Sequence, residues 1–196
     1  MKTLRIILWA LVAATAIASA VLFWRQSSSQ SPEQTASEFI IGGPFNLVDS
    51  DGQPFASSKL SGRPYAMFFG FTHCPDVCPA TLARLVKLRR QMGGDEAFHI
   101  VFVTVDPERD GPDEVGRYAE LFGAPVIGLT GSPAQIAQVK KAFGIFSEKV
   151  GGGDNYTVDH TAAVLLFDRN GRFQSTISPE ETDAPALAKL RRLTAG

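Results

Sequence analysis

One short stretch, residues 69–79, constrains this chain more than any other. It reads Phe-Gly-Phe-Thr-His-Cys-Pro-Asp-Val-Cys-Pro and holds both cysteines of the protein, Cys74 and Cys78. The apolar run 65–69 precedes it, and a helical pattern of apolar residues follows it. Pro75 is expected in the first helical turn, where its missing N–H costs nothing. The pattern predicts a strand-to-helix corner, with Cys74 at or just before the helix N-terminus and Cys78 about one turn later.

Such a corner determines what the two cysteines can do. Free backbone N–H groups and the positive end of a helix dipole favour a thiolate over a thiol. Residues four apart on a helix share a face, so the two sulfurs can converge. A disulfide, a redox couple and part of a soft-metal site all stay open at this point. Packing as two inert small hydrophobic residues is the remaining alternative, and the flanking prolines argue against it.

The first 25 residues differ from the rest of the chain. After a short basic start, the nineteen residues 6–24 carry no charge, and Trp9 and Trp24 stand near the two ends of this run. That length and those aromatic residues suit a membrane-spanning helix. We therefore predict an N-terminal anchor over residues 1–25, with a cleaved signal sequence ending at Ala18-Ser19-Ala20 as the alternative. Either segment would export the domain, in a bacterium to the periplasmic side of the inner membrane, where thiols meet oxidising conditions.

Two further segments follow the anchor. Residues 26–38 are rich in Ser and Gln and predict a flexible tether that would let the domain reach a membrane-bound partner. Residues 39–196 are expected to form one domain. Without Lys2, Arg5 and Arg25 the chain has 16 basic and 20 acidic residues. With this acidic balance and no basic stripe, we expect no nucleic-acid partner.

Within residues 39–196, predicted strands alternate with predicted helices. This order predicts an α/β sandwich around a mixed sheet, and the cysteine corner after the first buried strand is typical of a thioredoxin-like fold. We expect an N-terminal hairpin, and an inserted hairpin or loop before the last sheet strands. The expected segments are the hairpin 45–55, apolar strands over 65–71, 98–105, 126–129 and 161–167, and helices over 76–91, 112–122, 133–143 and 183–193.

Among the three histidines, His160 is the strongest ligand candidate. It follows a glycine-rich loop and Asp159, and it immediately precedes a predicted buried strand. In a thioredoxin-like sheet that loop lies against the cysteine corner. His99 is interpreted as an ordinary strand-edge residue, and His73 as a structural or outer residue. Two thiolates and one imidazole form a soft three-donor set, which suits cuprous copper better than structural zinc with its four protein ligands. Asp159 is expected to orient the imidazole.

Three sequence blocks lie in order within residues 39–193, namely Gly70–Pro79, Thr104–Asp110 and Val158–Thr161. With these blocks the chain resembles the Sco/SenC family of copper chaperones. What the resemblance implies is a thioredoxin-like domain that binds one copper ion, cuprous or cupric, through Cys74, Cys78 and His160. It also implies a role in assembling the dinuclear copper centre of cytochrome c oxidase subunit II, or of another periplasmic copper protein.

Two alternatives remain beside the copper chaperone. One is a thiol–disulfide oxidoreductase that reduces the cysteines of the same copper centre through Cys74 and Cys78. Two features argue against it. Three residues separate the two cysteines, and the residue before Thr161 is a histidine where thiol oxidoreductases have a cis-proline. The other is a redox sensor or thiol peroxidase, for which the chain offers no specific motif. Five acidic or imidazole side chains are expected to surround the ligands or to face a partner: His73, Asp76, Asp106, Asp110 and Asp159.

Overall fold

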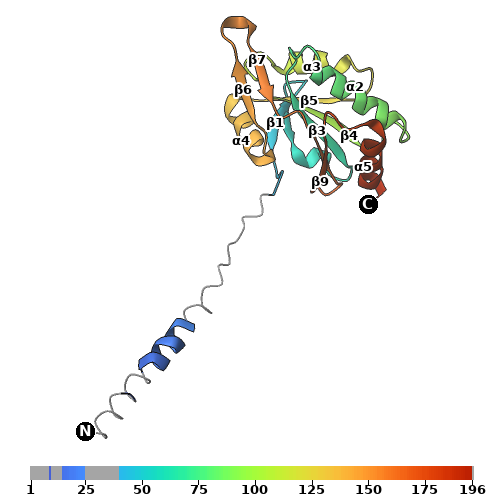
Figure 1. Ribbon diagram of the computed structural model, residues 1–196. Coiled ribbons are helices and arrows are strands. Elements are labelled where there is room, and N and C mark those ends of the chain that lie inside the picture. Colours follow the sequence, from blue (N-terminus) through green and yellow to red (C-terminus); the bar gives the residue numbers. More distant parts are fainter. Residues whose placement is uncertain (1–8, 10–14, 25–39, 196) are drawn as a thin grey trace, which may run out of the picture. The chain divides into compact units, whose positions relative to one another are not determined.

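The computed structural model describes residue 9, residues 15–24 and residues 40–195 (Figure 1). The chain divides into two compact units, Met1–Phe39 and Ile40–Gly196. In the first unit, residues 15–24 are helical. Within the described residues, no helix is both long and apolar enough to cross a membrane. The predicted tether and most of the predicted anchor lie outside the described residues, so both stay predictions.

The second unit is built on a seven-stranded mixed sheet with the strand order β2-β1-β5-β4-β3-β8-β9. The central strands β3, β4 and β5 run parallel, and every other pairing in the sheet is antiparallel. The α/β prediction with a mixed sheet is therefore confirmed. The strands are β1 Asn46–Asp49, β2 Pro54–Ala56, β3 Tyr65–Gly70, β4 His99–Thr104, β5 Ile127–Thr130, β8 Val164–Phe167 and β9 Phe173–Ile177.

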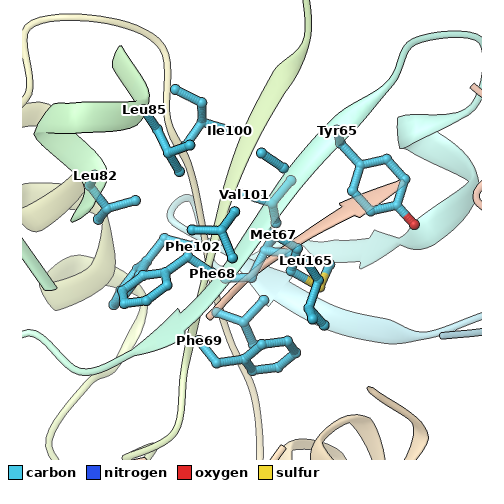
Figure 2. Packing of buried hydrophobic residues seen from close by; sticks show 14 of the residues in the cluster. Tyr65, Met67, Phe68, Phe69, Leu82, Leu85, Ile100, Val101, Phe102 and Leu165 are labelled. Carbon is cyan, nitrogen blue, oxygen red and sulfur yellow. The ribbon is translucent and has the colours of Figure 1, made fainter. Parts of the chain in front are cut away.

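Helices cover both faces of this sheet. On one face, Leu82 and Leu85 project from α2 toward Ile100 and Phe102 of β4 (Figure 2). The helices α3 and α5 lie on the same face as α2, because Tyr118 of α3 packs on Phe102 and Arg84 of α2 binds Asp183 of α5. On the opposite face, α4 packs its Phe143 on Phe69 of β3. The helices are α2 Val77–Arg90, α3 Pro112–Glu120, α4 Pro133–Phe143 and α5 Asp183–Ala195.

Local sequence explains why the elements start and stop where they do. All six residues of β3 are buried, as expected of a central strand that is covered on both faces. Ser132 and Gln135 form a capping box at the start of α4, and Gly144 ends this helix with a left-handed φ of 67°. The N-terminal hairpin turns at Gly52, whose φ of 71° suits glycine.

A separate two-stranded sheet carries the residue predicted to be the third ligand. Among the described strands, β6 (Ser147–Val150) and β7 (Thr157–His160) pair only with each other, and the short 3-10 helix η2 (Gly153–Asn155) joins them. Figure 1 shows this hairpin, coloured orange, projecting beyond the main sheet. We call residues 147–160 the arm. The sequence predicted a hairpin here, but it placed His160 directly before a buried strand, whereas β8 begins at Val164.

Candidate metal centre

The first feature of the site is the turn between β3 and α2. The helix begins at Val77 with Asp76 as its N-cap residue, so Pro75 lies before the helix. The prediction that Pro75 lies in the first helical turn is therefore wrong. The N–H of Cys74 donates to the carbonyl of Phe71 at 3.2 Å, which closes the turn. Cys74 is half-buried and not helical. The two cysteines therefore do not share a helical face.

The sulfur of Cys74 takes the place of a helix cap. The Cys78 N–H, one of the donors without an intrahelical partner at the start of α2, points at Cys74 Sγ at 3.4 Å. The Asp76 side chain makes no capping hydrogen bond. The Cys74 sulfur therefore accepts a backbone hydrogen bond that a capping side chain would otherwise accept. The two sulfurs are thus neighbours because of this turn.

The second cysteine is packed much more tightly. Cys78 is fully buried, and its sulfur rests against Gly70 at the end of β3. A Cβ on Gly70 would stand 2.8 Å from Cys78 Sγ and about as close to the rings of Phe68 and Phe102. Burial raises the pKa of the Cys78 thiol, and the neighbouring Cys74 and Asp110 raise it further. The expectation that the helix N-terminus would favour a thiolate is therefore wrong for Cys78.

His160 meets this buried thiol from the arm. Its Nε2 lies 3.5 Å from Cys78 Sγ, and its Nδ1 lies 3.0 Å from the carbonyl oxygen of Thr161. With Nδ1–H donating to that carbonyl, the lone pair of Nε2 faces the sulfur. The ring edges pack against Phe68 and Phe71. Burial lowers the pKa of His160, so the imidazole is held neutral, as a metal ligand must be.

The three predicted ligands are therefore brought together. Cys78 is the central member, since it contacts Cys74 through its N–H and His160 through its sulfur. Across the described part of the chain, no three Cys, His, Asp or Glu side chains already stand in a metal-binding arrangement. Two free thiols and a neutral imidazole, with aromatic rings packed against the imidazole, are the kinds of donor that bind a soft cation. Their joint role as ligands stays a prediction.

Asp110 stabilises the strand-to-helix corner through hydrogen bonds. Its buried carboxylate accepts hydrogen bonds from the Thr72 N–H at 2.9 Å, the Thr72 hydroxyl at 2.6 Å and the Thr104 hydroxyl at 2.7 Å. These bonds tie the turn before Cys74 to the end of β4. The exposed His73 also lies near Asp110, with its Nδ1 3.6 Å from the carboxylate. Asp110 is thus a structural residue.

Asp106 is buried as well, and it faces the arm. Its two carboxylate oxygens accept hydrogen bonds from the Tyr156 hydroxyl at 2.7 Å and from Arg109 Nε at 2.6 Å. Asp159 is exposed and acts on His160 only through its charge, which raises the imidazole pKa in opposition to burial. The contact that orients the ring comes from Thr161, and not from Asp159 as expected.

Several residues near the site were not singled out from the sequence. Gly70 is one, although a glycine inside an apolar strand is itself a signal of close approach by another group. Tyr118 of α3 is another. Its hydroxyl is buried without a hydrogen-bond partner among the described residues. Burial raises the pKa of Tyr118, and Cys78, Cys74 and Asp110 add to the effect. Arg109, in the segment between β4 and α3, and Tyr156, next to the tip of the arm, complete the group.

The fold and the site together define a class of protein: a thioredoxin-like α/β domain with a cysteine pair at a strand-to-helix corner and a histidine against it. Residues 33–195 match the SCO1/SenC family, and the chain belongs to this family. The resemblance inferred from the three sequence blocks is confirmed.

Known relatives agree with this assignment. The SCO2-like protein RP587 of Rickettsia prowazekii is 39% identical over 137 residues, which are 68% of this chain and 67% of that protein. The structure of Bradyrhizobium japonicum ScoI with copper bound is 42% identical, with a TM-score of 0.71, and the match covers 78% of this chain and 99% of that one. BsSco, described as a member of the Sco family of cytochrome c oxidase assembly proteins, has a TM-score of 0.63 over 79% of this chain and 94% of its own. At 22% identity it supports the fold alone.

Proposed function

We propose that this protein binds one copper ion through Cys74, Cys78 and His160, with cuprous copper as the favoured state. The observation that carries the proposal is the 3.5 Å approach of His160 Nε2 to Cys78 Sγ, with Nδ1 already committed to Thr161. A neutral imidazole and two sulfurs suit Cu(I), which accepts low coordination numbers and soft donors. The copper-bound ScoI structure, at 42% identity, supports the same cargo.

The physiological role that we propose is assembly of the dinuclear copper centre of cytochrome c oxidase subunit II. The family resemblance supports it. We further propose that residues 1–25 anchor the chain in the inner membrane and that residues 26–38 let the domain reach its partner on the periplasmic side. The periplasmic location is tested by fusing a reporter enzyme to the chain after residue 38, with a reporter that is active only after export. A fusion protein that is made in normal amounts but has no reporter activity would contradict it.

Competition against a cuprous chelator of known affinity tests the binding proposal. The reduced full-length protein should bind one equivalent of Cu(I), and His160→Ala should weaken binding at least about tenfold, since even groups that only orient a ligand cost that much. His73→Ala is the matched control, because His73 is an exposed imidazole beside the same corner. Equal affinities of wild type and His160→Ala would show that the three-donor site is wrong.

A second candidate function is reduction of the cysteines of the partner's copper centre. The observation in its favour is that Cys74 is half-exposed beside a buried, free Cys78. The Cys74 thiolate would attack a partner disulfide and form a mixed disulfide, releasing one partner thiolate. Cys78, losing its proton, would then attack Cys74 Sγ and release the second partner thiolate, so two electrons pass to the partner. A disulfide-exchange rate with an oxidised subunit II peptide no faster than that of glutathione would remove this candidate.

A further inference from the structure

The position of His160 depends on an element that is outside the main sheet. The arm pairs only with itself, from Ser147 opposite His160 to Val150 opposite Thr157. At its base, Thr161 and Phe146 exchange two hydrogen bonds of 3.0 and 3.1 Å. These bonds fix where the arm starts but not the angle at which it leaves the domain. A two-stranded hairpin is only marginally stable by itself, so contacts elsewhere must hold the arm.

Tyr156, next to the tip of the arm, supplies those contacts. Its hydroxyl donates to Asp106 Oδ1 at 2.7 Å, and its carbonyl accepts from Arg109 Nη1 at 3.0 Å. The Arg109 guanidinium also lies 3.6 Å from the centre of the Tyr156 ring. Hydrogen bonds to charged groups are stronger than those between neutral groups, and a cation over an aromatic ring adds to them. Asp106, Arg109 and Tyr156 together form what we call the latch.

The latch also reaches the cysteine corner. Asp106 uses its second oxygen to hold Arg109 Nε at 2.6 Å, so one buried carboxylate orients both partners. Arg109 lies 5.9 Å from the centre of the Phe71 ring, and Phe71 stands perpendicular to the His160 ring at 5.9 Å. The same guanidinium therefore touches the arm and the residue that packs on the imidazole.

A weaker contact lies outside the latch. Lys149 of β6 binds Glu108 at 2.6 Å and sits 4.7 Å above the Tyr156 ring. Both partners of this ion pair are largely exposed, so solvent screens the pair and it is expected to contribute little. The arm has two further contacts with the domain: Lys140 Nζ donates to Ser147 Oγ at 2.6 Å, and Val158 is buried in the core cluster. The latch, with its buried Asp106, is the support next to the tip of the arm.

We propose that Tyr156 and Arg109 are positioning residues for His160. They hold the arm closed, so that the His160 Nε2 faces Cys78. The inference rests on the proposed copper site but concerns residues that would not touch the metal. If the closed arm is the binding-competent state, the apparent affinity falls in proportion to the fraction of closed molecules. Loosening the latch until only a tenth of molecules are closed would therefore cost about tenfold in copper affinity.

The test compares Tyr156→Phe with Tyr65→Phe in the full-length protein. Tyr156→Phe removes only the hydroxyl that reaches Asp106. Tyr65 is a buried tyrosine stacked on Phe167, and its substitution leaves the latch intact. Amide hydrogen exchange is measured without copper, and affinity is measured by Cu(I) chelator competition. Tyr156→Phe is expected to speed exchange over residues 147–160 severalfold and to weaken copper binding about threefold to tenfold, while Tyr65→Phe changes neither.

Three outcomes would overturn the inference. Unchanged exchange in the arm would show that the latch does not hold it. Faster exchange with unchanged affinity would show that holding the arm does not position His160. Exchange that rises equally in β3 and β4 would make Tyr156 an ordinary structural residue. Arg109→Lys, which keeps the charge but loses the planar fork, gives a second variant with the same expected pattern.

A spectroscopic measurement separates this inference from the proposed function. In the cupric complex, nitrogen hyperfine coupling reports the imidazole, so Tyr156→Phe should show a partial loss of that signal and His160→Ala a complete loss. If the wild type binds no copper, or if His160→Ala binds as tightly as the wild type, the copper site itself fails. If those two behave as expected and the latch variants match the wild type, only the positioning role fails.

Discussion

Gly70 and Cys78 fit together so closely that no side chain can be added between them. A Cβ at position 70 would lie 2.8 Å from Cys78 Sγ, and 3.0 and 3.1 Å from the rings of Phe68 and Phe102. Two of these neighbours are rings inside the core, so neither can move away easily. The glycine is thus required by packing and not by its backbone conformation.

Gly70→Ala should therefore displace the Cys78 sulfur. We expect a loss of about 1–3 kcal/mol in the free energy of unfolding, as for other overpacked cores, and a copper affinity lower by about tenfold. Urea unfolding and chelator competition measure the two effects. Gly152→Ala is the control, because nothing lies within 4 Å of a Cβ there and its φ of −146° suits alanine. Wild-type affinity in Gly70→Ala would refute the prediction.

The Asp110 carboxylate accepts three hydrogen bonds with only two oxygens, two from the partly buried Thr72 and one from the buried Thr104. Asp110→Asn removes the charge that strengthens all three hydrogen bonds, and its amide nitrogen can be paired only if the Thr72 hydroxyl turns to accept from it. We expect the free energy of unfolding to fall by about 1–3 kcal/mol and the amide of Thr72 to exchange faster. Asp113→Asn, an exposed position on α3, should change stability by less than about 0.5 kcal/mol. Equal stabilities of the two variants would contradict this account.

Arg89 at the end of α2 is a buried cation. Its side chain is 2% exposed, its Nη1 donates to the Pro125 carbonyl at 2.8 Å, and its Nη2 lies 2.9 Å from Asp95. Arg89→Met keeps most of the volume but leaves that carbonyl unpaired, which should cost about 1–3 kcal/mol of unfolding free energy. Thermal and urea unfolding measure the loss. The exposed neighbour Arg90→Met should stay within about 0.5 kcal/mol of the wild type, and a similar loss in both would argue against burial as the cause.

Low pH should destabilise the copper-free protein through His99. Burial lowers the pKa of His99, and the nearby Arg63 and Arg89 lower it further, against the opposing charge of Glu96. As the pH falls below about 6.5, the ordinary histidine pKa, the unfolded chain takes up a proton that the folded chain refuses, so stability declines. Urea unfolding at pH 7.5 and 5.5 should show a smaller decline in His99→Gln than in the wild type. An equal decline in both would exclude His99 as a source.

Local patterns predicted most of the fold. The alternation of apolar strands with capped helices was enough to place the central strands and α4, because Ser132 and Gly144 are strong end signals. The limits of α2 were less certain. Pro75 was expected inside the helix, yet Asp76 is its N-cap residue. Proline is tolerated on either side of a helix start, so the sequence alone does not decide.

The sequence was enough to predict the three donor residues of the site but not the residues that surround them. Cys74, Cys78 and His160 were identified from residue type and position, and the structure brings them together. The roles of Asp106 and Asp110 could not be assigned, because a sequence does not show that a carboxylate is buried. The latch could not be foreseen either. Its contacts join Tyr156 to Arg109, 47 positions earlier in the chain, and to Asp106, 50 positions earlier. No local sequence pattern predicts contacts at such separations.

The spacing of the three donors also sets an order of assembly during synthesis. The two sulfurs belong to one strand–turn–helix unit, whereas the imidazole comes 82 residues after Cys78. At about 5–20 residues per second, a ribosome adds that length in roughly 4–16 s. During this interval the growing chain presents a dithiol alone. A soft ion met then would be bound by sulfur only, so a sulfur–sulfur–nitrogen complex is evidence that synthesis has passed residue 160 and that the arm has folded.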